Sequence, residues 1–432
     1  MSLSFVKNSL STRHIVTALG LSLLLLAGSA TAGDREKARR MYDRLAGVPP
    51  TNAELDTMVP LMATDPYAAA DIAMTNPNFL NVTVKNMVIP WTNEEQTVFA
   101  PLNDTAATLI GMIRDGHDFR KVLYGDILYK GVGVTAAYSQ SNNNHYVELE
   151  NRNLPLITAL EPSIDPTTPP RQSDETGAID PAGIAGVLTT RASAREFFDL
   201  GTNRAMFRFT MMNYLCTDLE QLKDITRTPN RIRQDVSRSP GGDSSVFLNN
   251  CIGCHAGMDG LAGAFAYHEW LVNPVDADDP DVRDTGHLVY ATTTNPVPDY
   301  TLGTTTYSGA LVQSKIRHNQ NNFIYGYFTE NESWINYWRT GVNAKLGWDG
   351  TVANQPVTNP QTPSTGNGPA SLGMELANTD AFSRCQVTKV YRHVCFNDPD
   401  QATLQTLMSV FSSNNYNLRT VFAESAIQCQ GD

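Results

Sequence analysis

The sequence predicts a mainly α-helical protein, because helix-start signals recur along the chain and apolar residues follow them at helical spacing. Residues 51–54, Thr-Asn-Ala-Glu, have the form of a capping box. Asp65-Pro66 and Asp398-Pro399 each place a capping Asp before a proline at the first helical position. After the second of these pairs, four apolar side chains fall on one face of the expected helix. They are Leu404, Leu407, Met408 and Phe411.

The expected helices form an N-terminal and a C-terminal set. In the first half they are expected at 34–46, from 51, from 65, at 104–114 and at 119–128. In the second half they are expected within 192–224, at 261–271, from about 380, from 398 and at 418–429. Val82-Thr-Val84 is the place where a short strand is expected. The stretch 162–181 holds several prolines with Thr, Asp and Ser, which indicates a linker or a long surface loop.

The segment 276–365 differs from the rest of the chain in composition. It is rich in Thr, Tyr, Asn, Gly and Pro and has no sustained helical period, so we expect a loop-rich insertion with short strands or helices. Its three tryptophans, Trp334, Trp338 and Trp348, would suit a carbohydrate or another surface ligand. Buried aromatic side chains explain the same residues more simply.

Residues 251–255, Cys-Ile-Gly-Cys-His, form the most specific motif of the chain. The pattern C-x-x-C-H is the attachment signal of a c-type haem, in which Cys251 and Cys254 bond the haem and His255 supplies the proximal iron ligand. With 6 Cys and 8 His in 432 residues, the pattern arises by chance on the order of 10⁻³ times per chain. The motif occurs once and therefore predicts one covalently attached haem c. Residues 251–255 are called the haem motif below.

Three alternative roles for the two cysteines have less support. Half of a zinc ribbon needs a second C-x-x-C, which the chain lacks. A thioredoxin-like redox pair needs a βαβ setting, whereas the flanks 244–250 and 256–260 have the composition of loop and turn. A plain disulfide between Cys251 and Cys254 is the third alternative.

Attachment of this type of haem takes place outside the cytoplasm, and the N-terminus carries a matching export signal. Lys7 and Arg13 precede the apolar run 15–26, which is too short to span a bilayer. Ala30-Thr-Ala32 is a small-residue cleavage site, so 1–32 is expected to be a signal peptide. We therefore expect a periplasmic or extracellular protein without an integral membrane segment after cleavage.

The four remaining cysteines, Cys216, Cys385, Cys395 and Cys429, are expected to form two disulfides in an oxidising compartment. Cys385 and Cys395 are expected on one helix, and ten helical residues rise about 15 Å, which is beyond disulfide reach. Pairing of Cys385 with Cys395 is therefore disfavoured. Cys216 and Cys429 are each left to pair with one of them, and the choice between the two arrangements stays open.

A second iron ligand is expected opposite His255, because electron-transfer haems of this type are usually six-coordinate. Met374 is the first candidate, since the Gly/Pro-rich stretch 366–374 resembles the distal-ligand loop of small c-type cytochromes. His318 and His393 are the alternatives. Met258 and His268 follow the proximal histidine closely and are expected on its own side. The long spacing from His255 to Met374 is explained if the insertion bulges from an otherwise ordinary haem domain.

These observations define the expected fold class and domains. The fold is mainly α, with a helical N-terminal domain and a cytochrome c-like haem domain interrupted by a loop-rich insertion. The expected parts are the signal peptide at 1–32, the N-terminal domain at 33–180, the first part of the haem domain at 181–275, the insertion at 276–365, and the C-terminal haem-domain helices at 366–432.

Charge limits the class of partner. The chain has 32 Lys and Arg against 44 Asp and Glu, and removal of Lys7 and Arg13 with the signal peptide leaves a net charge of about −14. An acidic exported protein is a poor nucleic-acid binder. A basic redox partner would be attracted to it, although solubility alone explains the charge.

Six stretches resemble a family of large exported proteins first noticed in planctomycetes, which are built from domains of unknown function around one c-type haem motif. The stretches are 44–55, 118–126, 186–190, 208–216, 251–259 and 381–385. Only the haem motif is specific by itself. The family often has Pro after its Met-Asp pair, whereas Gly260 follows Met258-Asp259 here. The resemblance implies a redox-active haem protein and supplies no substrate.

Three functions follow as hypotheses. The first is a monohaem cytochrome that transfers single electrons to or from an unidentified redox partner. The second is a haem enzyme of peroxidase or oxygenase type, which would need an open distal face with an acid–base side chain. The third is a haem-based binding or sensor module. The first is favoured. Two strong protein ligands on the iron would indicate electron transfer, and one would indicate catalysis or gas binding. No hydrolase, metalloprotease, P-loop or dinucleotide motif appears.

Overall fold

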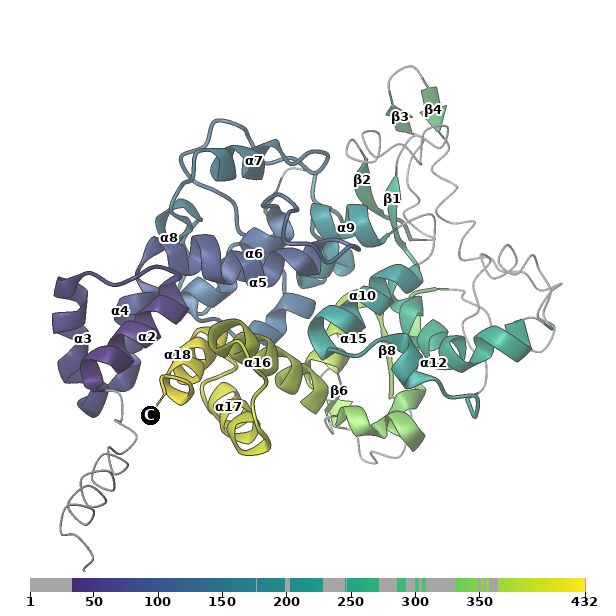
Figure 1. The fold of residues 1–432 in the computed structure, drawn as a ribbon. Helices are drawn as coiled ribbons and strands as arrows, with labels where there is room; N and C mark the ends of the chain where they lie inside the picture. Colours follow the sequence, from purple (N-terminus) through teal and green to yellow (C-terminus); the bar gives the residue numbers. More distant parts are fainter. Residues whose placement is uncertain are drawn as a thin grey trace, which may run out of the picture.

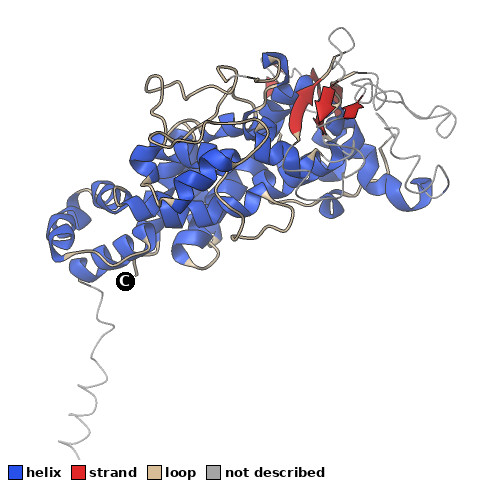
Figure 2. Cartoon of the chain, turned by 90° about the horizontal axis from the view of Figure 1, so that it is seen from above, coloured by secondary structure: helices blue, strands red, loops and turns tan. Residues whose placement is uncertain are grey.

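The computed structural model describes most of the chain from Gly33 onwards. The described residues are 33–175, 177–198, 203–227, 245, 247–271, 286–292, 300–302, 305–307, 331–348, 351–352, 355–356 and 364–431. Helices dominate these residues, which confirms the mainly α fold class (Figure 1). Seen from above, the larger strands gather at one end of an elongated helical body (Figure 2).

The first three helices are α2 (Asp34–Ala46), α3 (Asn52–Thr64) and α4 (Pro66–Met74), and the last two begin at the capping signals of the sequence. Thr51 and Glu54 form both hydrogen bonds of a capping box at the start of α3. The Asp65 side chain accepts from the Ala68 N–H, and Pro66 takes the first position of α4. The three helices pack on one another.

Two local predictions in the next region are wrong. Residues 82–84 lie in a π-helix, η1 (Phe79–Val84), and not in a strand. Leu80 and Val84 are fully buried whereas Val82 is 40 % exposed. A strand would place all three on one face, so the burial follows a helical period. The expected helix at 119–128 is only a 3₁₀ turn, η3 (Phe119–Leu123), after which Gly125 accepts a backbone hydrogen bond from Gly186 at 2.7 Å.

The middle of the chain consists of short helices around α6 (Asp104–Asp115). The others are α5 (Lys85–Val88), η2 (Ile89–Thr92), α7 (Asn144–Asn151), α8 (Leu156–Ala159), η4 (Pro181–Gly183), η5 (Gly186–Thr189), α9 (Arg191–Phe197), α10 (Asn203–Leu215) and η6 (Leu219–Leu222). Asp104 is fully buried, and its carboxylate accepts from the backbone N–H groups of Arg191 and Ala192. One buried carboxylate thus joins the start of α6 to the start of α9.

The second half combines helices with two-stranded antiparallel sheets. The helical elements are η8 (Phe247–Cys251), α12 (Ile252–Ala262), η9 (Gly263–Phe265), η10 (Tyr337–Arg339), η11 (Gly341–Leu346), α15 (Gly368–Ala377), α16 (Asp380–Cys395), α17 (Gln401–Ser413) and α18 (Leu418–Gln428). The paired strands are β1 (His268–Leu271) with β2 (His287–Tyr290), β3 (Tyr300–Leu302) with β4 (Thr305–Tyr307), β5 (Ser333–Asn336) with β8 (Ser364–Asn367), and β6 (Thr351–Val352) with β7 (Gln355–Pro356).

The C-terminal helices pack against the N-terminal ones. Helix α18 lies on α4 and α2, and α16 lies on α10, α17 and α18 (Figure 1). Arg40 and Arg44 of α2 donate to the backbone carbonyls of Gln430 and Cys429. One hydrophobic core cluster accordingly runs from Ala38 to Ala426 and includes residues on both sides of the boundary expected at 180.

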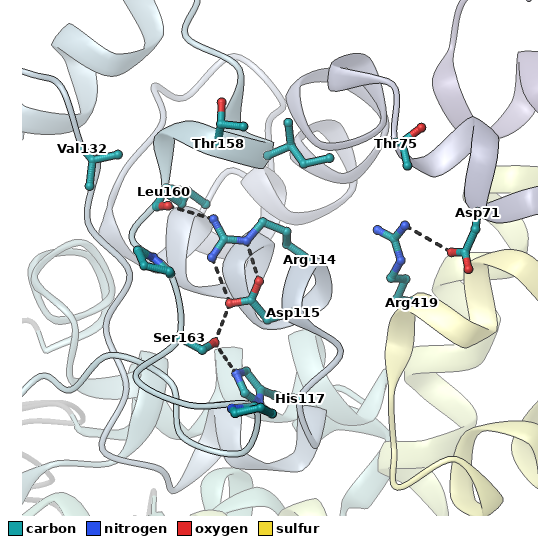
Figure 3. Close-up of a pocket in the computed structure, with 13 residues that line it drawn as sticks. Asp71, Thr75, Arg114, Asp115, His117, Val132, Thr158, Leu160, Ser163 and Arg419 are labelled. Carbon is teal, nitrogen blue, oxygen red and sulfur yellow. Dashed lines mark hydrogen bonds and ion pairs between the residues drawn. The ribbon is translucent and has the colours of Figure 1, made fainter.

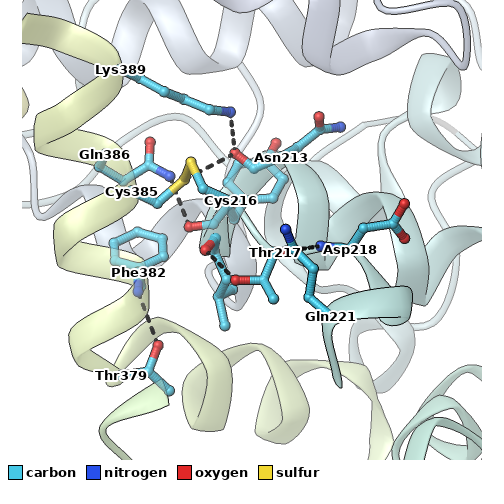
Figure 4. Close-up of a disulfide and its surroundings, with 12 residues drawn as sticks. Asn213, Cys216, Thr217, Asp218, Gln221, Thr379, Phe382, Cys385, Gln386 and Lys389 are labelled. Carbon is cyan, nitrogen blue, oxygen red and sulfur yellow. Dashed lines mark hydrogen bonds between the residues drawn. A yellow bond between two sulfur atoms is a disulfide. The ribbon is translucent and has the colours of Figure 1, made fainter. Parts of the chain in front are cut away.

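Two disulfides join distant parts of the chain. Cys216, directly after α10, bonds Cys385 of α16 (Figure 4), and Cys395 bonds Cys429. Cys385 and Cys395 lie on the same helix, α16, and do not pair with each other. This arrangement is one of the two that the helix-length argument left open.

No helix among the described residues is both long enough and apolar enough to cross a membrane.

Loss of the Cys216–Cys385 bond is expected to destabilise the fold more than loss of Cys395–Cys429. The first bond closes a loop of 169 residues and the second a loop of 34. Chain entropy then predicts losses of about 5 and about 4 kcal/mol for the paired Cys→Ala variants. Urea unfolding followed by circular dichroism measures both. A larger loss for the shorter loop would contradict the chain-entropy mechanism.

Lys389 is expected to make stability depend on pH. Its ammonium donates to the Asn213 carbonyl at 2.5 Å (Figure 4). It also lies 4.0 Å from the Trp91 ring centroid. Burial, with a smaller contribution from Arg392, lowers the pKa of Lys389 to about 7. The unfolded chain, with an ordinary lysine pKa of about 10.4, binds more protons between these values, so stability rises with pH across that window.

Lys389→Met removes this titration. We expect the wild type to gain more than about 1 kcal/mol relative to this variant between pH 7 and pH 9. Urea unfolding at the two pH values gives the difference, and parallel pH profiles for the two proteins would refute the prediction.

Candidate functional site

The haem motif spans the end of η8 and the start of α12, which together form a continuous helical segment. The expectation of loop and turn on both sides of the motif is wrong: η8 (Phe247–Cys251) runs directly into α12 (Ile252–Ala262). The helix expected at 261–271 is instead the end of α12, followed by η9 and strand β1. Gly253, Gly257 and Gly260 give the segment a low helix propensity, which is why the sequence pattern was misleading.

Two of these glycines let α12 lie directly on the strand and turn beneath it. A Cβ atom at Gly257 would stand 1.9 Å from Nε1 of Trp338, and one at Gly260 would stand 2.9 Å from the carbonyl oxygen of Ile335. Trp338 is 1 % exposed and belongs to η10, directly after β5. The glycines therefore serve close packing, which outweighs their poor helix propensity.

The motif is the partly exposed part of its helix. Residues 251–255 are all half-buried, whereas 256–271 are buried without exception. Cys251 and Cys254 carry free thiols, in contrast to the four disulfide-bonded cysteines. Burial raises the pKa of the Cys254 thiol, whose Sγ lies 3.8 Å from the Leu219 carbonyl. Two reduced and reachable thiols, with a histidine beside them, are the groups that covalent haem attachment requires.

The imidazole of His255 is hydrogen-bonded to a buried ion pair, which Asp259 forms with Arg204. Its Nδ1 lies 3.0 and 3.2 Å from the two carboxylate oxygens of Asp259, one helical turn further on. Arg204 of α10 donates from Nε to the same carboxylate at 2.8 Å. Burial alone would raise the pKa of Asp259, but Arg204 and His255 hold it at about 2. Asp259 is therefore ionised and accepts from the imidazole.

This arrangement fits a haem and sets which nitrogen would bind iron. A carboxylate on Nδ1 fixes the tautomer with the proton on Nδ1, so Nε2 would be the nitrogen that faces a metal. Among the described residues, no three His, Cys, Asp or Glu side chains gather closely enough to hold a bare metal ion. The donor set is two thiols and one imidazole on a single helical segment.

Met374 lies on a helix and not on a loop. The stretch 366–374 ends β8 and forms most of α15 (Gly368–Ala377), with Pro369 in the first turn. Proline is favoured there, so the Gly/Pro composition marks a helix start and the loop expectation is wrong. Met374 itself is half-buried. Helix α15 packs on η9, the turn directly after α12, whereas the haem motif lies at the opposite end of α12.

The alternative ligands are placed differently. His318 lies outside the described residues. His393 is on α16, and its ring bonds the backbone of Thr83 in the N-terminal half; burial, the larger effect, lowers its pKa. Of the two residues expected on the proximal side, Met258 is buried at 3 % exposure. His268 is fully buried, and its Nε2 lies 2.7 Å from the Gly183 carbonyl.

The tryptophans of the insertion do not form an exposed binding surface. Trp334 and Trp338 are each 1 % exposed, and Trp348 is half-buried with its Nε1 donating to the Trp338 carbonyl at 3.0 Å. The interpretation as buried aromatic side chains therefore holds for Trp334 and Trp338, which have no face available for a sugar ring.

A hollow lined by none of the predicted site residues opens where the N-terminal half meets α18 (Figure 3). Its volume is about 980 Å³, and its lining includes Asp71, Arg114, Asp115, His117, Ser163 and Arg419. Ser163 Oγ lies 2.7 Å from His117 Nε2 and donates to Asp115 at 2.6 Å. No sequence pattern predicted this group. Ser163 is far from Asp115 and His117 in the sequence, and a loop brings it next to them.

The hydrogen-bond order in this hollow differs from that of a catalytic triad. In a triad the serine donates to the histidine and the carboxylate orients the histidine. Here the single hydroxyl proton of Ser163 goes to Asp115, so His117 is the donor to Ser163. Burial opposes ionisation of Asp115, yet bonds from Arg114 and Ser163 keep its pKa below the usual value. The group therefore fastens the loop at Ser163 to the end of α6 and does not activate the serine.

Comparison of the chain with known protein families, with curated proteins and with solved structures found no match. The site is accordingly defined by its own chemistry: two thiols, an imidazole and a buried carboxylate–guanidinium pair.

Gly257→Ala is expected to destabilise the site, because the new Cβ would overlap the Trp338 indole. The expected loss is about 1–3 kcal/mol, the usual cost of overpacking. Gly253→Ala is the matched control on the same helix, where the nearest atom, Cγ2 of Ile225, is 3.6 Å away.

Thermal unfolding of the two purified variants measures the difference. We expect the control to unfold at or slightly above the wild-type temperature, since alanine favours helix. Equal melting temperatures for the two variants would show that α12 does not press on Trp338.

Proposed function

We propose that the protein is an exported monohaem c-type cytochrome that transfers single electrons to or from a redox partner. The observation that carries the proposal is the haem motif on α12, with free thiols at Cys251 and Cys254 and with His255 fixed through Nδ1. When bound, the haem supplies a one-electron iron couple. The resemblance to the planctomycete family of exported haem proteins agrees with this function.

The chain's own residues have distinct tasks in this proposal. Cys251 and Cys254 hold the haem covalently, which prevents its loss outside the cell. His255 would hold the iron through Nε2. Met374 would be the second iron ligand, because thioether ligation is common in electron-transfer haems and the helix of Met374 packs on η9, which follows α12. His318 and His393 remain the alternatives.

Export to the periplasm or the cell exterior is part of the proposal. Its support is the signal-peptide pattern of 1–32 and the two disulfides, which persist in oxidising compartments. The acidic net charge of about −14 after cleavage favours a basic protein partner and disfavours nucleic acid.

The deciding experiment is a visible absorption spectrum of the purified mature protein, oxidised and reduced, with and without carbon monoxide. We expect a c-type spectrum that is low-spin and unchanged by carbon monoxide, because two protein ligands occupy the iron. Met374→Ala should open one position, give a high-spin fraction and admit carbon monoxide. His393→Ala is the control and should behave as the wild type.

The contrary outcomes lead to different conclusions. Absence of covalent haem after denaturation would refute the proposal outright. A high-spin wild type that binds carbon monoxide would replace electron transfer by a haem enzyme or sensor. A low-spin Met374→Ala spectrum with a carbon-monoxide response in His393→Ala would move the distal ligand to His393.

A further inference from the structure

We propose that Asp259 is a positioning residue for the haem iron: its buried carboxylate holds His255 through Nδ1, fixes the imidazole plane and lowers the reduction potential. This inference rests on the proposed function and adds the residue that tunes it. Nothing in the C-x-x-C-H pattern itself specifies an acid at this position.

The geometry makes Asp259 the hydrogen-bond partner of the proximal imidazole. The two residues are one helical turn apart on α12, so their side chains stand on the same face. Both carboxylate oxygens lie within hydrogen-bond distance of Nδ1, at 3.0 and 3.2 Å. An ionised carboxylate only accepts, so the proton stays on Nδ1 and the ring turns Nε2 away from Asp259.

Arg204 keeps the carboxylate charged in a buried place. The Asp259 side chain is 1 % exposed and the Arg204 side chain 14 % exposed. Nε and a terminal nitrogen of Arg204 reach the two carboxylate oxygens at 2.8 and 3.3 Å. This fork holds the carboxylate plane and balances its charge without competing for Nδ1. The pair thus orients the imidazole from α10, a helix outside the haem motif.

The direction of the effect on the iron follows from ligand basicity. A hydrogen bond from Nδ1–H to a carboxylate makes the imidazole a stronger electron donor. A stronger donor favours the ferric over the ferrous state and lowers the reduction potential. A neutral acceptor at the same place would raise it.

Asp259→Asn in the full-length holoprotein is the first test. The amide accepts from Nδ1 more weakly, and we expect the ferrous state to gain at least tenfold, which is a rise of about 59 mV for a one-electron couple. A spectroelectrochemical titration measures this rise. Asp224→Asn is the matched control, because Asp224 is a 4 %-exposed carboxylate paired with Arg227 and bonded through its backbone N–H to Gly253 of the motif.

The double variant Arg204→Gln with Asp259→Asn separates hydrogen bonding from charge. It removes one positive and one negative charge together, so the net charge of the site is unchanged and no buried guanidinium is left unpaired. If the bond to Nδ1 sets the potential, the double variant keeps most of the rise. If Asp259→Asn alone does not fold, the reduction potential of the double variant still tests the role of the hydrogen bond to Nδ1.

The outcomes are distinct. A double variant that returns to the wild-type potential, or an Asp224→Asn shift as large as that of Asp259→Asn, would overturn the inference and leave only a general charge effect. Haem staining after denaturation is run on every protein. Wild type without covalent haem refutes the proposed function itself, whereas stained variants with unshifted potentials refute only the role of Asp259.

Discussion

A buried ion pair between Arg339 and Glu375 holds together the segments on which α12, the helix of the haem motif, packs. The side chains are 1 % and 0 % exposed, and two 2.7 Å bonds join the guanidinium to the two carboxylate oxygens. Ser364 and Asn336 donate to the same carboxylate at 2.6 and 2.7 Å. The pair thereby ties β5, η10, β8 and α15 together. Removing one partner would leave a buried charge uncompensated, at a cost of about 3–5 kcal/mol.

These joined segments position the haem motif through a series of packing contacts that starts at β5 and η10. Trp338 and Ile335 belong to these segments and contact the glycine face of α12. The other face of α12 carries His255 and Asp259, and Asp259 bonds Arg204 of α10 there. Helix α10 is joined in turn to α16 by the disulfide that follows it. Because α16 and α18 pack on the N-terminal helices, the geometry of the motif depends on the whole helical body. This dependence gives the long chain around one haem motif a structural role.

The sequence predicted the features that depend on local chemistry. The caps at Thr51 and Asp65 and the sharing of one helix by Cys385 and Cys395 follow from short-range rules, and the structure has them. The prediction was wrong where tertiary packing overrides composition. Gly257 and Gly260 indicated a turn but serve close helix packing. The glycine and proline before Met374 are a different case, because they form a local helix-start signal that was interpreted as a loop. Arg204 was not found, because the only signal that links it to His255 is spatial.

A comparison of the buried pairs Arg339–Glu375 and Arg204–Asp259 shows how Asp259 differs from a purely structural acid. Glu375 receives its hydrogen bonds from an arginine, a serine and an amide, all of which fasten neighbouring backbone segments. Asp259 also accepts from an arginine, Arg204. Its other partner is the imidazole of His255 and not a serine or an amide. In the proposed holoprotein, a group bound to Nε2 of His255 would therefore respond to the charge of Asp259.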